Sequence, residues 1–162
     1  MLFSCVVPEA NIFVNCYELV TLSGRGSVIR ARVDLATHMH VSDRVKRVAT
    51  SAFSELGSGL SESVYQHAIA VALRGVGYSV EVEKVLPVTF REHQVGFIRA
   101  DLVVGGDFVI EVKTVHKLTD THVAQLKAYL LRVPEHSEGP SGMLVNFTLT
   151  SVEFREVSLN SM

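Results

Sequence analysis

Asp101, Glu111 and Lys113 are the residues whose types and spacing could most directly carry out chemistry. Two carboxylates at a suitable separation are what a hard divalent cation such as Mg²⁺ requires, with water and phosphate oxygens filling its remaining positions. A lysine beside them would offset part of their negative charge. All three residues lie between positions 99 and 113, so whether they meet depends on how that stretch folds.

The stretch 99–113 is predicted to form a β-hairpin, because two apolar runs flank a pair of glycines. Its alternating apolar residues share one face only if Leu102 lies opposite Ile110, since a slip of one residue turns every side chain over. This register leaves a short loop and places Asp101 directly opposite Glu111 on the other face. The hairpin therefore predicts a pair of facing carboxylates.

Such a pair carries an energetic cost that Lys113, which points the same way, offsets only in part. Carboxylates directly across a ladder have Cβ atoms roughly 5 Å apart. At that separation they repel by about 3 kcal/mol at an effective dielectric near 20. Either a cation lies between them or one is protonated. The alternative is a solvated strand face that carries Glu111 and Lys113 as ordinary surface charges.

Composition limits the classes of protein to consider. The chain has 162 residues, is 48% hydrophobic and 20% charged, and suits one globular domain with a sizeable core. Its net charge of −2 means that nucleic acid could be bound only through a local patch. Cys5 and Cys16 lack the spacing of a disulfide framework or metal site, so free thiols are predicted. With neither a signal peptide nor a run of transmembrane length, we expect an intracellular protein without membrane contact.

Residues 1–40 are predicted to be β-rich and carry no catalytic motif. His38 and His40 could ligate a metal, but such a pair in a polar connector is more often part of an ordinary loop. Basic residues outnumber acidic ones between positions 25 and 47. That segment would be either a phosphate-facing patch or a solvated face.

The rest of the chain alternates between helical and strand periodicity, which predicts an α/β sandwich with a mixed sheet. Helices are expected at 42–56, with Ser42 or Asp43 as the N-cap and Gly57 just past the end, at 61–74 and at 119–132. Strands are expected at 78–82, 85–90, 95–104, 108–113, 143–147 and 152–157.

A short motif and several polar residues follow one another along residues 59–147. They are Gly59, Glu62 and Tyr65 in the spacing GxxExxY, then Asp101, Glu111, Val112, Lys113, Gln125 with Tyr129, and the run at 142–147. In this order the set resembles the GxxExxY proteins, a branch of the PD-(D/E)xK nuclease superfamily, over about residues 41 to 150. The resemblance implies a restriction-endonuclease-like α/β sandwich with a central mixed β-sheet flanked by helices. Residues 41–162 would form the nuclease-like domain, with 1–40 as an N-terminal β-rich extension of unknown role.

The resemblance also implies a metal-dependent nuclease that hydrolyses nucleic-acid phosphodiester bonds. Asp101 and Glu111 would hold Mg²⁺, for which Mn²⁺ could substitute, together with the Val112 carbonyl and Glu62. Lys113 would orient or deprotonate the attacking water and offset charge on the phosphate. The catalytic set implied is Glu62, Asp101, Glu111, Lys113 and Gln125, the last fixing the lysine or a phosphate oxygen.

Two departures from the family pattern stand out, Ala100 where proline is common and Phe53 where a histidine often occurs. Tyr65 is predicted to be a packing residue with a satisfied hydroxyl. Nucleic acid is the expected partner, DNA ahead of RNA, and a homodimer is usual for enzymes that cut two strands. The alternative is a catalytically inactive nucleic-acid-binding or assembly module on the same fold.

Overall fold

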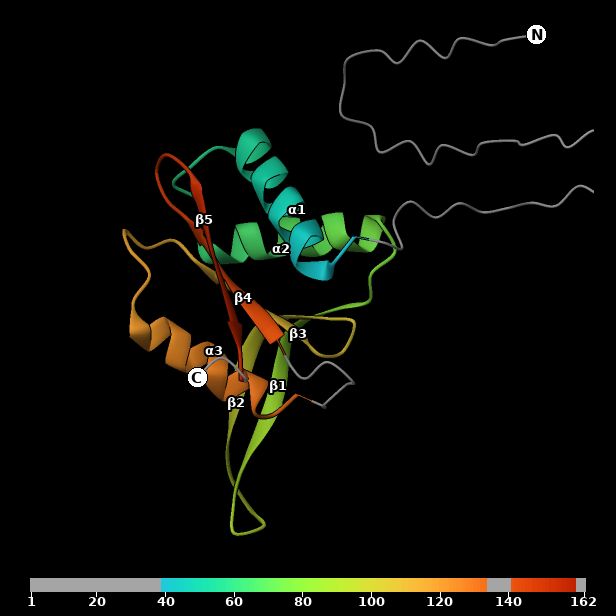
Figure 1. Ribbon diagram of the computed structural model, residues 1–162, viewed down its shortest axis with the longest axis vertical. Coiled ribbons are helices and arrows are strands. Elements are labelled where there is room, and N and C mark those ends of the chain that lie inside the picture. Colours follow the sequence, from blue (N-terminus) through green and yellow to red (C-terminus); the bar gives the residue numbers. More distant parts are fainter. Residues whose placement is uncertain (1–38, 134–140, 160–162) are drawn as a thin grey trace, which may run out of the picture. The chain divides into compact units, whose positions relative to one another are not determined.

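The computed structural model describes residues 39–133 and 141–159 of the chain (Figure 1). Its elements, in order, are α1 (Val41–Leu56), α2 (Glu62–Gly75), β1 (Val80–Phe90), β2 (His93–Val104), β3 (Phe108–Lys113), α3 (Asp120–Leu130), β4 (Ser141–Phe147) and β5 (Val152–Ser158). Among the helices of these ranges, none combines the length and apolar character needed to cross a membrane. The predictions for strands before residue 39, the two cysteines and His38 lie outside the described residues.

The five strands form one mixed sheet in the order β1-β2-β3-β4-β5. All neighbours are antiparallel except β3 and β4, which run parallel and are joined through α3. Gly142 permits this parallel pairing, because a Cβ there would collide with the Val109 carbonyl and crowd Leu126 of α3. The sheet therefore keeps β3 and α3 close together.

Helices cover both faces of the sheet, so the predicted restriction-endonuclease-like α/β sandwich is confirmed. Helices α1 and α2 bury their apolar stripes on one face, through residues such as Val45 and Ile69. Helix α3 buries Leu126 and Leu130 on the other. Successive residues of the predicted hairpin point to opposite faces of the sheet, and each face packs against a separate core.

Helix α1 begins one residue earlier than predicted, and its N-cap is His40 rather than Ser42 or Asp43. The Nδ1 atom of His40 accepts a hydrogen bond from the Ser42 amide at 3.3 Å and lies 2.8 Å from its hydroxyl. An imidazole thus does what a serine or aspartate side chain usually does at this position. Gly57 ends the helix as predicted, with φ of 76° and its amide bonded to the Phe53 carbonyl.

The two strands predicted at 78–82 and 85–90 form the single strand β1, which pairs with β2 throughout. The interruption falls at Glu83, which has φ of 51° and lies across from Asp101. On β2, Ala100 belongs to the core under α3 whereas Leu102 belongs to the core under α2. Residues two apart share a face in a regular strand, so the ladder rotates at Asp101.

Beyond this rotation, β1 and β2 continue as a long hairpin past the helices (Figure 1). We call residues 84–99 the β1–β2 arm. The turn at its tip has positive φ at both Arg91 and Glu92, which is the geometry of a type I′ hairpin turn. The arm thus begins where the candidate site lies.

Candidate functional site

The hairpin of β2 and β3 has the predicted register, with Leu102 paired to Ile110. Leu102 and Ile110 form the last backbone pair between the two strands. At the next step the Asp101 carboxylate takes the place of a backbone acceptor, because its Oδ2 accepts a hydrogen bond from the Val112 amide at 2.8 Å. The carboxylate is thereby fixed beside the backbone that carries Glu111.

Asp101 is held from a second side by Gln66, whose side-chain amide donates to the Asp101 carbonyl at 2.8 Å. Gln66 is buried on α2, so this bond ties the helix layer to the point where β2 rotates. Burial raises the pKa of the Asp101 carboxyl above its usual value. The Val112 hydrogen bond and Lys113 oppose that shift, while other carboxylates nearby add to it.

Glu111 is only 2% exposed, which excludes the alternative in which it is an ordinary charge on a solvated strand face. Its Oε1 accepts hydrogen bonds from Lys113 Nζ at 2.6 Å and from Gln125 Nε2 at 2.7 Å. Burial, followed by the charge of Asp101, raises the pKa of Glu111 to about 7. Its Oε2 is buried, and this oxygen of the carboxylate has no hydrogen-bond partner among the described residues.

Lys113 points toward the same cluster from the end of β3. Burial disfavours its ammonium, but the hydrogen bond and charge of Glu111 outweigh burial and raise the pKa of Lys113. The lysine therefore stays protonated across the neutral range. It supplies a fixed positive charge next to two carboxyl groups.

Gln125 comes from α3, where Thr119 and His122 form a capping box that sets the start of the helix. The Gln125 side chain donates to Glu111 and also to the Tyr129 hydroxyl at 2.7 Å. Tyr129 lies one helical turn later and is buried, which raises its pKa. The helix thus presents a fixed donor to the Glu111 carboxylate.

Glu62 lies in the first turn of α2, where an acid would be expected simply to complement the helix dipole. Its Oε1 instead accepts a hydrogen bond from the Thr114 amide at 3.1 Å, directly after Lys113. Its charge contributes to the raised pKa values of Asp101 and Glu111. Glu62 therefore interacts with the cluster through its hydrogen bond to the Thr114 amide and through its negative charge.

Tyr65 has the predicted packing role. It is fully buried, its hydroxyl donates to the Gly57 carbonyl at 2.6 Å, and its ring stacks on Phe147 with centroids 3.9 Å apart. The motif tyrosine thereby anchors the loop before α2. That loop sets where Glu62 begins its helix.

Asn146 is a site-supporting residue to which sequence reasoning gave no role. It is fully buried on β4, accepts a hydrogen bond from the Val115 amide and donates to the Val115 carbonyl, both at 2.9 Å. A second donated bond reaches Glu153 on β5. These contacts hold the chain just after Lys113. The signal in the sequence is a lone amide within the apolar run of β4, since a buried polar group needs partners.

Glu83 is a second residue near the site that the sequence did not single out. It lies across from Asp101, raises that residue's pKa, and faces Arg99 at 3.6 Å. Its sequence context, alternating charged and apolar residues on a strand, is that of an ordinary solvated face. Nothing in that pattern indicates the positive φ that turns the strand here.

The donor set suits a hard divalent cation, although residues 39–133 and 141–159 contain no cluster of three or more His, Cys, Asp or Glu side chains poised to ligate one. Asp101 and Glu111 supply two carboxylates, and the Glu111 Oε2 atom has no other partner. Mg²⁺ commonly takes one or two protein carboxylates and completes its coordination with water and phosphate. The residues present therefore fit such an ion.

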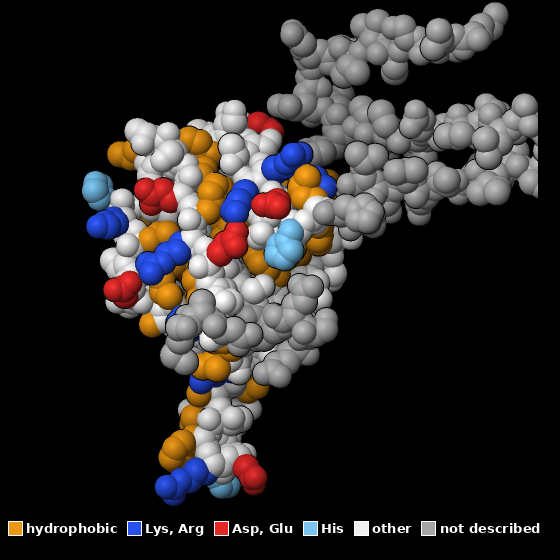
Figure 2. All heavy atoms as spheres, viewed as in Figure 1, with side chains coloured by type: hydrophobic (Ala, Val, Ile, Leu, Met, Phe, Trp, Pro, Cys, Tyr) orange, Lys and Arg blue, Asp and Glu red, His pale blue; other side chains and the backbone are white. Residues whose placement is uncertain are grey.

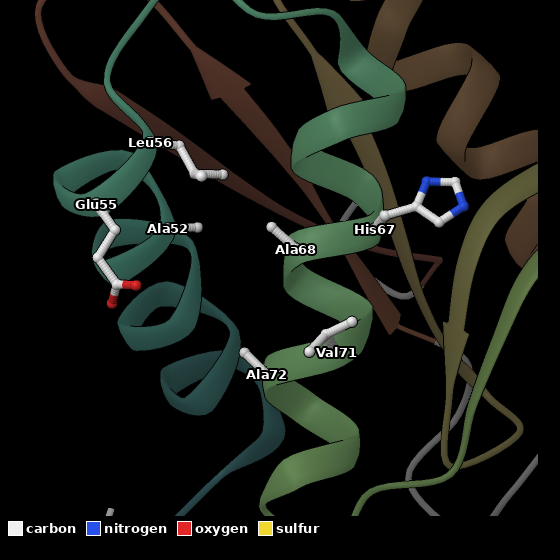
Figure 3. A pocket seen from close by; sticks show the side chains of 7 residues that line it. All are labelled: Ala52, Glu55, Leu56, His67, Ala68, Val71 and Ala72. Carbon is white, nitrogen blue, oxygen red and sulfur yellow. The ribbon is translucent and has the colours of Figure 1, made fainter. Parts of the chain in front are cut away.

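An open pocket lies elsewhere, between α1 and α2 (Figure 3). Its floor consists of small residues such as Ala52, Ala68 and Ala72, while Glu55 and His67 lie at its edge. None of the five candidate catalytic residues lines it. The chemistry therefore does not coincide with this pocket.

Comparison with known proteins gives a matching family model and solved structures to which the chain is similar. The family model described as the PD-(D/E)XK nuclease superfamily matches residues 39–157. A solved crystal structure of the protein SSO0001 is 21% identical, with a TM-score of 0.44, over 72% of this chain. The match spans 59% of the length of that protein. No curated protein matches the sequence.

Proposed function

Because the chain belongs to the PD-(D/E)XK nuclease superfamily, we propose that it is a metal-dependent nuclease that hydrolyses phosphodiester bonds in nucleic acid. The observation that carries this proposal is the pairing of the half-buried Asp101 with the buried Glu111 beside the protonated Lys113. Within the superfamily we assign it to the GxxExxY branch, on the spacing of Gly59, Glu62 and Tyr65.

Mg²⁺ would be held by Asp101, Glu111 and the Val112 carbonyl, with Glu62 contributing directly or through water, and Mn²⁺ could substitute. When bound, such an ion lowers the pKa of its water and stabilises negative charge on the phosphate. The buried, unpartnered Oε2 of Glu111 supports this assignment, because a bound cation would compensate its desolvation.

Lys113 serves in this proposal as a protonated donor. Its raised pKa favours an ammonium that orients the attacking water and offsets charge on the phosphate, over a neutral amine that removes a proton. Gln125 fixes the Glu111 carboxylate through Oε1, which leaves Oε2 directed elsewhere. Gln125 is thus a positioning residue in this mechanism.

The substrate proposed is DNA ahead of RNA, with a homodimer as the form that would cut two strands. A net charge of −2 supports recognition through a local surface rather than through bulk attraction. The acidic site itself would need its cation before a phosphate could approach.

A cleavage assay tests the proposal. The purified chain is incubated with labelled DNA and RNA, single-stranded, duplex and branched, in Mg²⁺, Mn²⁺ or EDTA. We expect cutting with metal only, and we expect Lys113→Ala to reduce its rate by about a hundredfold or more while nucleic-acid binding stays intact. Lys46→Ala is the matched control, because Lys46 also forms a 2.6 Å ion pair, with Glu156, on a remote surface.

Two results would count against the nuclease. Cleavage by Lys113→Ala at the wild-type rate would remove the lysine from the mechanism. No cleavage of any substrate, together with no metal binding by calorimetry, would instead support an inactive nucleic-acid-binding or assembly module.

A further inference from the structure

The β1–β2 arm concentrates exposed apolar side chains. Of the ten large hydrophobic residues that are exposed in the described ranges, four lie on it: Val85, Phe90, Val95 and Phe97. Figure 2 shows hydrophobic side chains along the arm and charged ones at its tip. Such a concentration on one projecting element marks an interaction surface.

One face of the arm is open and carries an aromatic ring beside a cation. Pro87 pairs with Phe97, and Val85 pairs with Arg99, so these neighbouring pairs lie on the same face. The opposite face buries Leu86 in the core under α3. Phe97 is 63% exposed and the Arg99 side chain 64% exposed. The Phe97 ring is therefore open to a ligand, and the Arg99 guanidinium is open to solvent while it faces Glu83 at 3.6 Å.

We propose that this open face of the arm binds unpaired nucleotides next to the scissile phosphate, an inference that rests on the proposed nuclease function. Aromatic rings on an exposed strand face stack with bases, which only unpaired nucleotides can present. Arginine beside the ring adds charge for the backbone and a planar group for stacking. At the tip, Arg91 lies 5.2 Å above the Phe90 ring and repeats this combination.

The arm is continuous with the candidate site. Arg99 precedes Asp101 by two residues on β2, and Phe97 precedes it by four, a span of roughly 13 Å along a strand. A strand of nucleic acid whose phosphate lies at Asp101 would reach Phe97 within a few nucleotides. The substrate class is therefore nucleic acid with a single-stranded segment at the cut.

A second copy of the chain fits the arm less well. Strand β1 lies at the edge of the sheet, but Pro87 lacks an amide hydrogen, and the register shifts between Val88 and Thr89. Both features protect an edge against pairing with another strand. The guanidinium groups of Arg91 and Arg99 also favour an anionic partner.

The test measures binding by fluorescence anisotropy, with the full chain in EDTA so that metal-dependent cutting cannot occur. The probes are a labelled single-stranded oligonucleotide and its blunt duplex. We expect Phe97→Leu, which keeps the apolar bulk but removes the π face, to weaken single-strand binding roughly tenfold. Phe97→Trp should preserve it. Val71→Ala, a change at a similarly exposed position on α2, is the control and should leave single-strand binding unchanged.

Each outcome decides the proposal. Wild-type binding by Phe97→Leu, or an equal loss for duplex and single strand, would overturn it and leave the nuclease assignment standing. Dissociation of a dimer by Phe97→Asp in sedimentation, with nucleic-acid binding unchanged, would overturn it in favour of self-association. Loss of single-strand binding by Phe97→Leu, in a chain whose Lys113→Ala variant cuts normally, would support the arm and reject the proposed catalysis.

Discussion

Glu111 carries a carboxyl group whose pKa lies near 7, because the protein buries it and sets Asp101 nearby. The folded chain therefore retains a proton that the unfolded chain releases at a much lower pH. The same burial that makes ionisation costly makes a cation a strong partner for the ionised form. A cation that bound the ionised Glu111 carboxylate would therefore take the place of this proton.

The pH dependence of stability follows from this pKa. In EDTA, the free energy of unfolding should fall as pH rises from about 4.5 to about 7, by on the order of 3 kcal/mol, because only the unfolded state loses the Glu111 proton in that window. Urea unfolding across the pH range measures it. In Glu111→Gln this slope should become much shallower, with the raised pKa of Asp101 as a remaining contribution, and parallel profiles for the two proteins would contradict the assigned pKa.

A bound metal ion should offset the free-energy cost of ionising the Asp101 and Glu111 carboxyl groups. At about pH 8 we expect Mg²⁺ to raise the melting temperature by a few degrees, and at about pH 5 to have little effect, because protonated carboxyls do not bind it. Asp101→Asn should raise stability in EDTA by relieving repulsion and should abolish the response to Mg²⁺. Asp43→Asn, on the exposed first turn of α1, is the control. An equal Mg²⁺ response in Asp101→Asn would exclude that carboxylate as a ligand.

The residue-level roles were predictable only where spacing alone decides them. Alternation on two strands predicts that Asp101 and Glu111 approach each other, and the confirmed pairing of Leu102 with Ile110 agrees. Burial of Glu111 was not predictable, because its neighbour across the layer, Gln125, comes from a helix after the hairpin. A charged residue on a strand gives the same sequence pattern whether or not a helix covers its side chain in the fold.

At the scale of the element, the crossover from β3 through α3 to β4 assembles the site. Strand β3 supplies Glu111 and Lys113, α3 supplies Gln125, and β4 supplies Asn146. The helix and strand periods predicted all of these elements, within a few residues at their ends. Periodicity could not predict that β1 is continuous through Glu83. The positive φ of Glu83 depends on the twist of the paired strands, which the sequence of one strand does not reveal.

Asn146 should matter for both stability and rate. We expect Asn146→Ala to lower the free energy of unfolding by about 2 kcal/mol, since it leaves backbone groups of Val115 without partners. The chain after Lys113 would then be less fixed, so kcat should fall about tenfold or more with KM nearly unchanged.

Val145→Ala, on the same strand, is the control for that experiment. It should lower stability by a similar amount through a lost apolar contact, yet leave kcat of the folded fraction unchanged. Equal kcat values for the two variants would reduce Asn146 to a purely structural role.

For the molecule as a whole, a net charge of −2 means that the proposed binding of nucleic acid would depend on a local cationic surface. Two cations of the arm face the proposed path, Arg91 and Arg99. Counterion release by about two contacts gives a log–log salt slope near −1.4 for a single strand. This is shallow compared with strongly basic nucleic-acid-binding proteins.

The slope is measurable by titrating a labelled single strand at several salt concentrations in EDTA. Arg99→Gln should make it shallower by about 0.7, the contribution of one contact. Lys46→Ala, which removes a cation remote from the arm, should leave the slope unchanged. A steep wild-type slope would show that other basic residues dominate binding.

The rotation of the ladder at Asp101 divides the two strands into a part that holds the candidate site and a part that forms the arm. The two parts are subject to different evolutionary constraints. The residues proposed to act on the phosphate are fixed by the layered core, by the crossover and by the pairing of Leu102 with Ile110. Apart from Leu86 and Ile98, which pack against the core under α3, the arm beyond Ala100 shares none of these register-setting contacts. Its length and sequence can therefore diverge among descendants of this chain while the reaction centre stays constant. Substrate preference and chemistry can be inherited as separable traits on one continuous pair of strands.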